Sequence, residues 1–131
     1  MRVQTVAVLV AFGVMLAATS ALAHHSFSAE YDANKPVTLE GVVTKIEWAN
    51  PHVYFYINVK DDSGKVTNWA LEMGQPAGLQ RQGWTKNTLQ IGDTVKVEGT
   101  LARNGNPHAN ARNVYKNGKK MGAASSEGQV N

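Results

Sequence analysis

The chain has 131 residues and a formal net charge of +3, from 13 lysine and arginine residues against 10 aspartate and glutamate residues. This modest charge is typical of a soluble domain rather than of a nucleic-acid-binding surface, so we expect no nucleic acid partner. The chain has no cysteine, which excludes disulfide bonds and thiolate metal sites, so the hydrophobic core alone has to stabilise the fold.

The N-terminus has the pattern of a secretory signal peptide. Arg2 is followed by an apolar run, and Ala21 and Ala23 form an Ala-x-Ala cleavage pattern. The run is shorter than the roughly 20 residues that a membrane helix needs, and no other apolar run in the sequence approaches that length. We therefore expect cleavage after Ala23, which removes residues 1–23. The mature protein would be periplasmic or secreted, begin at His24 and have no membrane span.

The first predicted strand changes phase along its length. Residues 24–36 lack periodicity and predict an extended N-terminal arm, and strand-like alternation starts after them. The earlier apolar residues then fall on one face, and the later ones on the other. A β-bulge near Gly41 would reconcile the two phases. The earlier set is Val37 and Leu39, and the later set is Val42, Thr44, Ile46 and Trp48.

The second and third predicted strands form a hairpin. Pro51 ends the first strand, and alternation resumes over residues 52–59. The turn sequence at residues 61–64 leads into a third strand that ends near residue 73. The residues expected in the core from this hairpin are Val53, Phe55, Ile57, Val59, Trp69, Leu71 and Met73.

A short helix and two further strands are predicted next. Pro76 suits the first turn of a helix that Gly83 ends. A fourth strand over residues 94–101 and a weaker fifth strand over residues 108–115 follow. Residues 122–131 are small and polar and predict a disordered tail.

The order of these elements favours an all-β fold, an OB-like barrel of five strands. In that fold one short helix lies between strands three and four. A six-stranded β-sandwich is the alternative. We expect the barrel domain to cover residues 37–121.

The face of strands two and three that points away from the core carries a group of polar and aromatic side chains. In OB-folds this face is the usual ligand surface, and tyrosine rings are suited to stacking. Ordinary cross-strand packing would account for the same tyrosines. The residues of this expected ligand surface are Tyr54, Tyr56, Asn68 and Glu72.

Three histidines lie at marked positions in the sequence. His24 and His25 would start the mature chain, and His52 directly follows Pro51. A free terminal amine and imidazole rings are nitrogen ligands that copper(II) accepts, so His24, His25 and His52 are the candidate metal ligands. Solvated histidines with no metal role are the alternative interpretation.

No catalytic arrangement is recognisable in the sequence. The serines and threonines have no adjacent histidine, and the carboxylates are not paired as a general acid and base. We therefore expect a binding module rather than an enzyme. Trp48 is expected in the core, whereas Trp84 is expected to cover one end of the barrel, and Arg81 is expected to pair with an acidic group or a carbonyl.

Several spaced motifs resemble a family of small secreted bacterial proteins known as domain of unknown function 6152. The motifs are His24-His25-Ser26-Phe27, Gly41-Val42-Val43, Glu47-Trp48-Ala49-Asn50-Pro51-His52, Trp69-Ala70-Leu71-Glu72, Leu79-Gln80-Arg81-Gln82-Gly83-Trp84 and Gly92-Asp93-Thr94-Val95-Lys96-Val97. The resemblance implies an exported, compact β domain and implies no activity. It directs attention to the motif residues His24, His25, Trp48, Asn50, His52, Glu72, Arg81 and Trp84.

We therefore expect an exported, non-catalytic binding module. It would hold copper through its mature N-terminal histidine and His52. The alternative is a metal-free module that contacts a protein or a glycan through the exposed face of strands two and three. In either case the partner would be a periplasmic protein or a small ligand.

Overall fold

A computed structural model describes residues 26–127 of the chain. A helical turn over residues 26–30 leads into six strands and one further helix. The elements are β1 (Tyr31–Glu47), β2 (Tyr54–Lys60), β3 (Val66–Glu72), α2 (Pro76–Arg81), β4 (Thr94–Ala102), β5 (His108–Lys116) and β6 (Lys119–Lys120).

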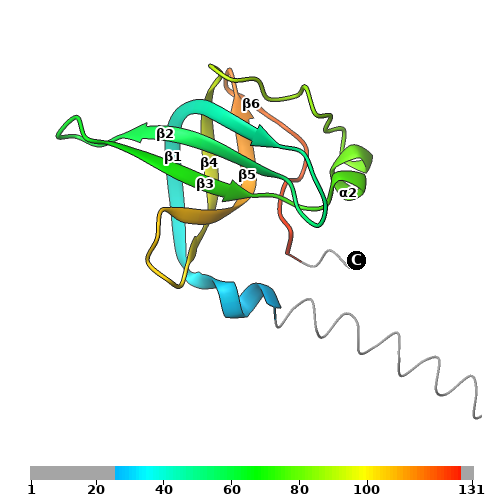
Figure 1. Cartoon of the computed structure of the whole chain (residues 1–131), viewed down its shortest axis with the longest axis horizontal. Helices are drawn as coiled ribbons and strands as arrows, with labels where there is room; N and C mark the ends of the chain where they lie inside the picture. Colours follow the sequence, from blue (N-terminus) through cyan, green and yellow to red (C-terminus); the bar gives the residue numbers. More distant parts are fainter. Residues whose placement is uncertain (1–25, 128–131) are drawn as a thin grey trace, which may run out of the picture.

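The strands form a closed ring. Their order is β3-β2-β1-β4-β5-β6, and a parallel pairing between β3 and β5 closes the first five into a barrel (Figure 1). The long β1 pairs with both β2 and β4, and α2 lies between β3 and β4 in the chain. This confirms the OB-like barrel with its single helix between strands three and four. The sixth strand is a two-residue addition that pairs with β5, not part of a second sheet.

The bulge on β1 lies at Thr44 rather than at Gly41. The register between β1 and β2 shifts between Val43 and Lys45. Val43 is therefore buried, and Val42, which we placed on the same face as Ile46 and Trp48, is 43% exposed. Gly41 has a different role, because a Cβ atom there would lie 2.3 Å from the Asn58 carbonyl oxygen. The glycine lets β1 and β2 approach closely, and the change of phase follows it.

The predicted core of the other strands is confirmed. The alternating apolar residues of β2, β3 and β4 turn inward and pack with Leu79 of α2 and with Trp84. Val59 and Trp69 are only partly buried but pack against the same cluster. The fully buried residues among those predicted are Val53, Phe55, Ile57, Leu71 and Met73, and Val95 and Val97 of β4 are buried with them.

Both ends of the described chain pack on the barrel more extensively than we expected. Tyr31–Glu47 is one strand, so the second half of the expected arm already belongs to the sheet, and residues 26–30 before it are helical. Residues 122–127 are not a free tail. Ala124 is buried, and its carbonyl accepts a hydrogen bond from the Gly74 amide at 2.9 Å. The small side chains of this segment allow it to lie directly against the barrel. From composition alone, the same small, polar residues had predicted disorder.

The helical turn lies at one end of the barrel, beside the connection between β4 and β5 (Figure 1). Arg103 in this connection attaches it, because its backbone amide donates to the Glu30 carbonyl at 2.9 Å and its Nε donates to the Ser28 carbonyl at 2.7 Å. No helix within residues 26–127 has the length and apolar character required to cross a membrane.

Candidate functional site

Glu72, the last residue of β3, is a buried carboxylate at the centre of a polar cluster. Strand alternation places it on the face opposite Leu71, so we expected it at the surface. It is instead only 3% exposed. Tyr31 from the N-terminal side and Ser126 from the C-terminal segment both reach its carboxylate and cover it.

The Glu72 carboxylate accepts four hydrogen bonds. Oε2 accepts from the Tyr31 hydroxyl at 2.7 Å and from the Tyr54 hydroxyl at 2.6 Å. Oε1 accepts from the Ser126 hydroxyl at 3.0 Å and from Nδ1 of His52 at 3.1 Å. A carboxylate has about four lone-pair sites, so these donors occupy its accepting capacity. Glu72 therefore acts as a positioning group rather than as a vacant ligand.

The cluster keeps Glu72 ionised. Burial raises the pKa of the carboxyl, but the hydrogen bonds from His52, Tyr54, Tyr31 and Ser126 outweigh it and lower the pKa to about 2. Burial, followed by the hydrogen bonds to Glu72, raises the pKa values of Tyr31 and Tyr54, so both phenols stay protonated as donors. The hydrogen bond to Glu72 also raises the pKa of His52.

His108, the first residue of β5, joins the cluster through Tyr31. Its Nε2 lies 2.9 Å from the Tyr31 hydroxyl oxygen. The single hydroxyl proton of Tyr31 is donated to Glu72, so His108 has to be the donor in this contact. In the neutral ring the lone pair is then on Nδ1, which lies 3.9 Å from Oε1 of Glu30. Ligand atoms of Glu30, Glu72 and His108 all lie within 4.8 Å of one another.

A second layer of hydrogen bonds fixes Ser126. The buried Asn110 donates through Nδ2 to the Ser126 hydroxyl at 2.6 Å, and its Oδ1 accepts from Ser125 at 2.7 Å. The C-terminal segment therefore completes the hydrogen bonding of Glu72.

Two imidazole rings are thus oriented by one buried carboxylate. Nδ1 of His52 donates directly to Glu72. Nε2 of His108 donates to the hydroxyl oxygen of Tyr31, which in turn donates to Glu72. Each ring keeps its other nitrogen for a further partner, and imidazole nitrogens are ligands for copper and zinc. These two nitrogens could therefore coordinate a metal ion at this end of the barrel.

The structure brings together only part of the expected sites. His52, Tyr54 and Glu72 meet in the cluster, whereas His24 and His25 lie outside the described residues. The remaining ligand-surface residues, Tyr56 and Asn68, have other partners. The Tyr56 hydroxyl donates to Glu47 at 3.0 Å, and Asn68 Nδ2 donates to Asn58 at 2.9 Å. The four residues of the expected ligand surface therefore do not act together. Tyr54 and Glu72 belong to the Glu72 cluster, whereas Tyr56 and Asn68 bind other side chains.

The other motif residues either pack in the core or lie at the surface. Trp84 is buried and donates through Nε1 to the Ala123 carbonyl at 3.1 Å, and Trp48 packs against the core. Asn50 is exposed in the loop before His52. Arg81 is exposed in the last turn of α2, and within residues 26–127 it has no salt bridge.

We did not predict from the sequence that three residues of the cluster, Tyr31, His108 and Ser126, belong to it. Tyr31 and Ser126 lie in segments without periodicity, and no local pattern connects either to Glu72. His108 offered the one usable signal, because it begins a predicted strand whose pairing could bring it near the end of the third strand. The parallel pairing of Ala70 with His108 has that effect.

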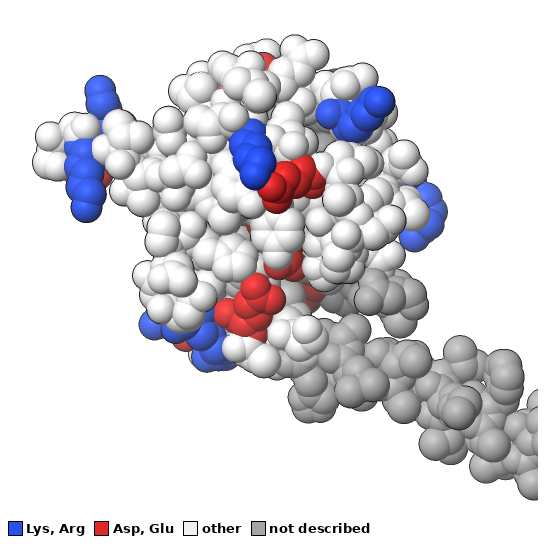
Figure 2. Space-filling view, viewed as in Figure 1, with Lys and Arg blue, Asp and Glu red and all other residues white. Residues whose placement is uncertain are grey.

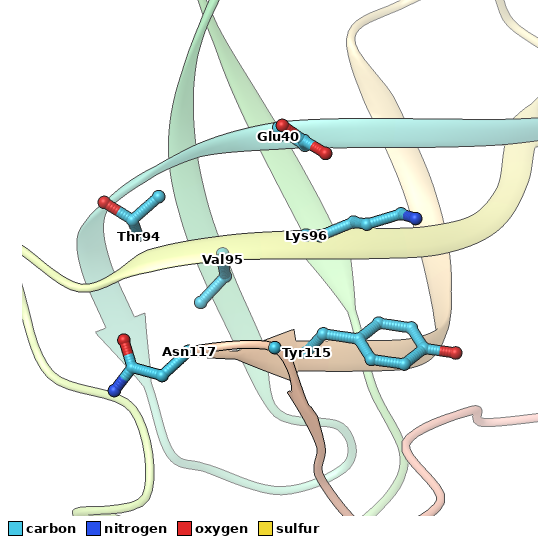
Figure 3. A pocket seen from close by; sticks show the side chains of 7 residues that line it. Glu40, Thr94, Val95, Lys96, Tyr115 and Asn117 are labelled. Atoms are coloured by element: carbon cyan, nitrogen blue, oxygen red, sulfur yellow. The ribbon is translucent and has the colours of Figure 1, made fainter.

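A separate hollow of about 510 Å³ lies where β1, β4 and β5 neighbour one another (Figure 3). It is lined by Glu40, Lys96, Tyr115 and Asn117 among others, and none of its lining residues belongs to the Glu72 cluster. Lys96 Nζ lies 5.8 Å from the centroid of the Tyr115 ring and 3.9 Å from Glu98. The lysine therefore already occupies the aromatic surface of this hollow.

Comparison with known proteins places the chain in a family. The sequence profile of the family of unknown function DUF6152 matches residues 11–113. The chain belongs to this family. No curated protein matches it.

The likeness to one solved structure, Rim1, supports the fold. The mitochondrial single-stranded DNA-binding protein Rim1 from S. cerevisiae superposes with a TM-score of 0.50 at 11% identity, covering 67% of this chain and 96% of Rim1. The N-terminal domain of PriB from Thermoanaerobacter tencongensis has a TM-score of 0.42 at 21% identity, covering 63% of this chain and 96% of that domain. At its level of identity the likeness to Rim1 shows the OB-like fold alone.

Proposed function

We propose that this protein is an exported, non-catalytic module that binds copper(II) through the N-terminal histidine of the processed chain, His24, and His52. The hydrogen bond from Nδ1 of His52 to buried Glu72 supports this proposal most strongly. In metal sites, a ligating histidine usually donates its other ring N–H to a carboxylate, which fixes the tautomer and the ring orientation. Glu72 holds His52 in this way and leaves Nε2 for the metal.

The position of the N-terminal segment also supports the proposal. Tyr31 ends this segment and donates to the same carboxylate that holds His52. Only His25 separates His24 from the first described residue. After cleavage following Ala23, His24 would carry both a free amine, with an ordinary pKa of about 8, and an imidazole ring. Copper(II) accepts such nitrogen-rich sites, and His25 would add a neighbouring ring.

Export is part of the proposal, because the amine of His24 exists only after cleavage. The Ala21-Leu22-Ala23 pattern supports cleavage at this position. N-terminal sequencing of the protein recovered from the periplasm or medium should read His-His-Ser-Phe. Retention of residues 1–23 would remove the terminal ligand.

The charges on the face that Figure 2 presents do not favour single-stranded DNA as a ligand of that face. Figure 2 shows acidic and basic side chains interspersed on the face it presents, with no large basic patch there. Binding of nucleic acid depends on lysine and arginine side chains gathered along the phosphate path. Tyr54 is also directed to Glu72 by its hydroxyl, which limits its use for stacking on a base or a sugar.

Copper titration of the processed protein tests the proposal. Protein that begins at His24 should bind about one equivalent of copper(II) tightly, and the visible d–d absorption of this tight site should indicate nitrogen ligands. His52→Ala and a one-residue extension before His24 should each weaken binding. Asn68→Ala is the matched control, because Asn68 is exposed on the expected ligand surface but does not contact the cluster.

The outcomes separate the alternatives. Equal copper affinity in the His52→Ala protein would mean that the terminus chelates alone, as a free peptide does, and would contradict the proposed site. Unaltered affinity in the extended protein would contradict the role of the His24 amine.

A further inference from the structure

His108 is oriented as a metal ligand independently of His52. Its Nε2 donates to the Tyr31 oxygen at 2.9 Å, and its ring lies edge-on to the Tyr31 ring with centroids 5.4 Å apart. The direction of this hydrogen bond follows from the donation of the Tyr31 proton to Glu72. The neutral ring therefore presents a lone pair on Nδ1, and its side chain is 18% exposed.

The carboxylate of Glu30 faces this nitrogen across a gap. Nδ1 and Oε1 of Glu30 are 3.9 Å apart, which is too long for a hydrogen bond. Two acceptor atoms at this separation have no direct attraction when the ring is neutral. A zinc ion lies about 2.0–2.1 Å from an imidazole nitrogen and about 2.0–2.2 Å from a carboxylate oxygen, so one ion would fit between them.

Glu30 is held in place without being neutralised. Its carbonyl accepts from the Arg103 amide, and the Arg103 guanidinium pairs with Asp32 rather than with Glu30. Among residues 26–127, His108 is the only basic side chain within 4.0 Å of the Glu30 carboxylate. The backbone of Glu30 is therefore positioned by the barrel, and its charge remains available.

We infer that Nδ1 of His108 and the carboxylate of Glu30 form a site for a divalent transition metal cation of the zinc class, completed by water. The folded domain alone forms this site, so it goes beyond the proposed function and needs neither His24 nor His52. Tyr31 is its positioning residue. Glu72 holds Tyr31 in turn, so one buried carboxylate supports both histidines.

Zinc titration of a protein with a blocked terminus tests this inference. The N-terminally extended protein, labelled with ¹⁵N at histidine, is titrated with ZnCl₂ and followed by imidazole NMR. Nδ1 of His108 should shift on binding, and the resonances of His52 should change much less. Glu30→Gln and His108→Gln should each weaken zinc binding at least about tenfold, because each removes a ligand. Glu40→Gln, an exposed carboxylate outside the cluster, is the matched control.

Tyr31→Phe separates positioning from ligation. It keeps the ring but removes the oxygen that accepts from His108, and loss of such an outer partner typically weakens metal binding about 10–100-fold. The ¹H–¹⁵N backbone spectrum reports whether this variant keeps the fold. The Glu30→Gln change is on an exposed side chain, so the test does not depend on Tyr31→Phe folding.

Each contrary result has a distinct meaning. No shift of His108 at millimolar zinc, or equal affinity in Glu30→Gln, would overturn the inference and leave a His108–Glu30 ion pair only. Neither result would affect copper binding by His24 and His52, which is measured on the processed protein. Zinc binding seen only after processing would also overturn the inference, because the site would then need the terminus.

Discussion

Replacing Glu72 by glutamine should destabilise the barrel strongly although the two side chains have nearly the same shape. One carboxylate oxygen becomes an amide nitrogen, which donates instead of accepting. Oε1 and Oε2 each accept two hydrogen bonds in the native cluster. Whichever way the amide turns, two of the four donors lose their acceptor.

The expected cost can be derived in two ways. A hydrogen bond to a charged group contributes about 1.5–3 kcal/mol, so two lost bonds cost about 3–6 kcal/mol. The same hydrogen bonds lower the pKa of Glu72 from an ordinary 4.5 to about 2, which corresponds to about 3 kcal/mol of stability at neutral pH. We therefore expect the free energy of unfolding to fall by about 3–5 kcal/mol, a large part of the total for a small domain.

Urea unfolding with EDTA present, followed by tryptophan fluorescence, measures this cost. Glu47→Gln is the matched control, because Glu47 also accepts from a tyrosine hydroxyl, that of Tyr56, but is much more exposed. An exposed interaction of this kind contributes less than about 1 kcal/mol. Equal costs for the two substitutions would refute the reasoning, because the Glu72 cluster would then behave as a solvated surface group.

The pH dependence of stability gives a second test of the same substitution. The folded-state pKa of Glu72 is lowered, so its contribution is present above pH 4.5 and is lost as the pH falls towards 2. The raised pKa of His52 reports the same contact. That contribution is present below the ordinary value of 6.5 and is lost as the pH rises through the folded-state value. Glu72→Gln should remove both slopes, and an unchanged acid limb would contradict the assignment.

Four further substitutions test the strand phase, the close approach at Gly41 and the packing of the C-terminal segment. Phe55→Ala should lower the free energy of unfolding by about 3–5 kcal/mol, because it leaves a cavity. Tyr56→Ala, on the opposite face of the strand, should lower it clearly less. Equal values in urea unfolding would show that the strand phase is wrong. Gly41→Ala should cost about 1–3 kcal/mol, because the new Cβ would meet the Asn58 carbonyl oxygen at 2.3 Å, and unchanged thermal stability would contradict that close approach. Ser126→Ala should cost about 1–3 kcal/mol, because Glu72 loses a donor and Asn110 loses an acceptor. A thermal unfolding midpoint equal to that of the native protein would mean that the C-terminal segment does not support the cluster.

The strands of the barrel could be predicted because alternation is a local property. Val53, Phe55 and Ile57 alternate with polar residues, and this period of two determines which face is buried without knowledge of the partner strand. Pro76 and Gly83 likewise limit α2 through their own backbone preferences. The bulge on β1 was misplaced because a glycine explains a bulge and a close approach equally well. Only the position of Asn58 on the neighbouring strand distinguishes the two.

The candidate site was determined mainly by tertiary structure. From the sequence, His52 and Glu72 could be placed at strand ends, and His24 and His25 at the mature terminus. No local pattern indicates that Tyr31 and Ser126 reach the same carboxylate across 41 and 54 residues of chain, or that His108 joins them through Tyr31, which lies 77 residues away in the chain. Those contacts arise because β3 pairs with β5 to close the barrel, while the two terminal segments pack over that end. A buried carboxylate is stable only with enough donors, and in this protein the closure of the barrel and the packing of both ends supply them.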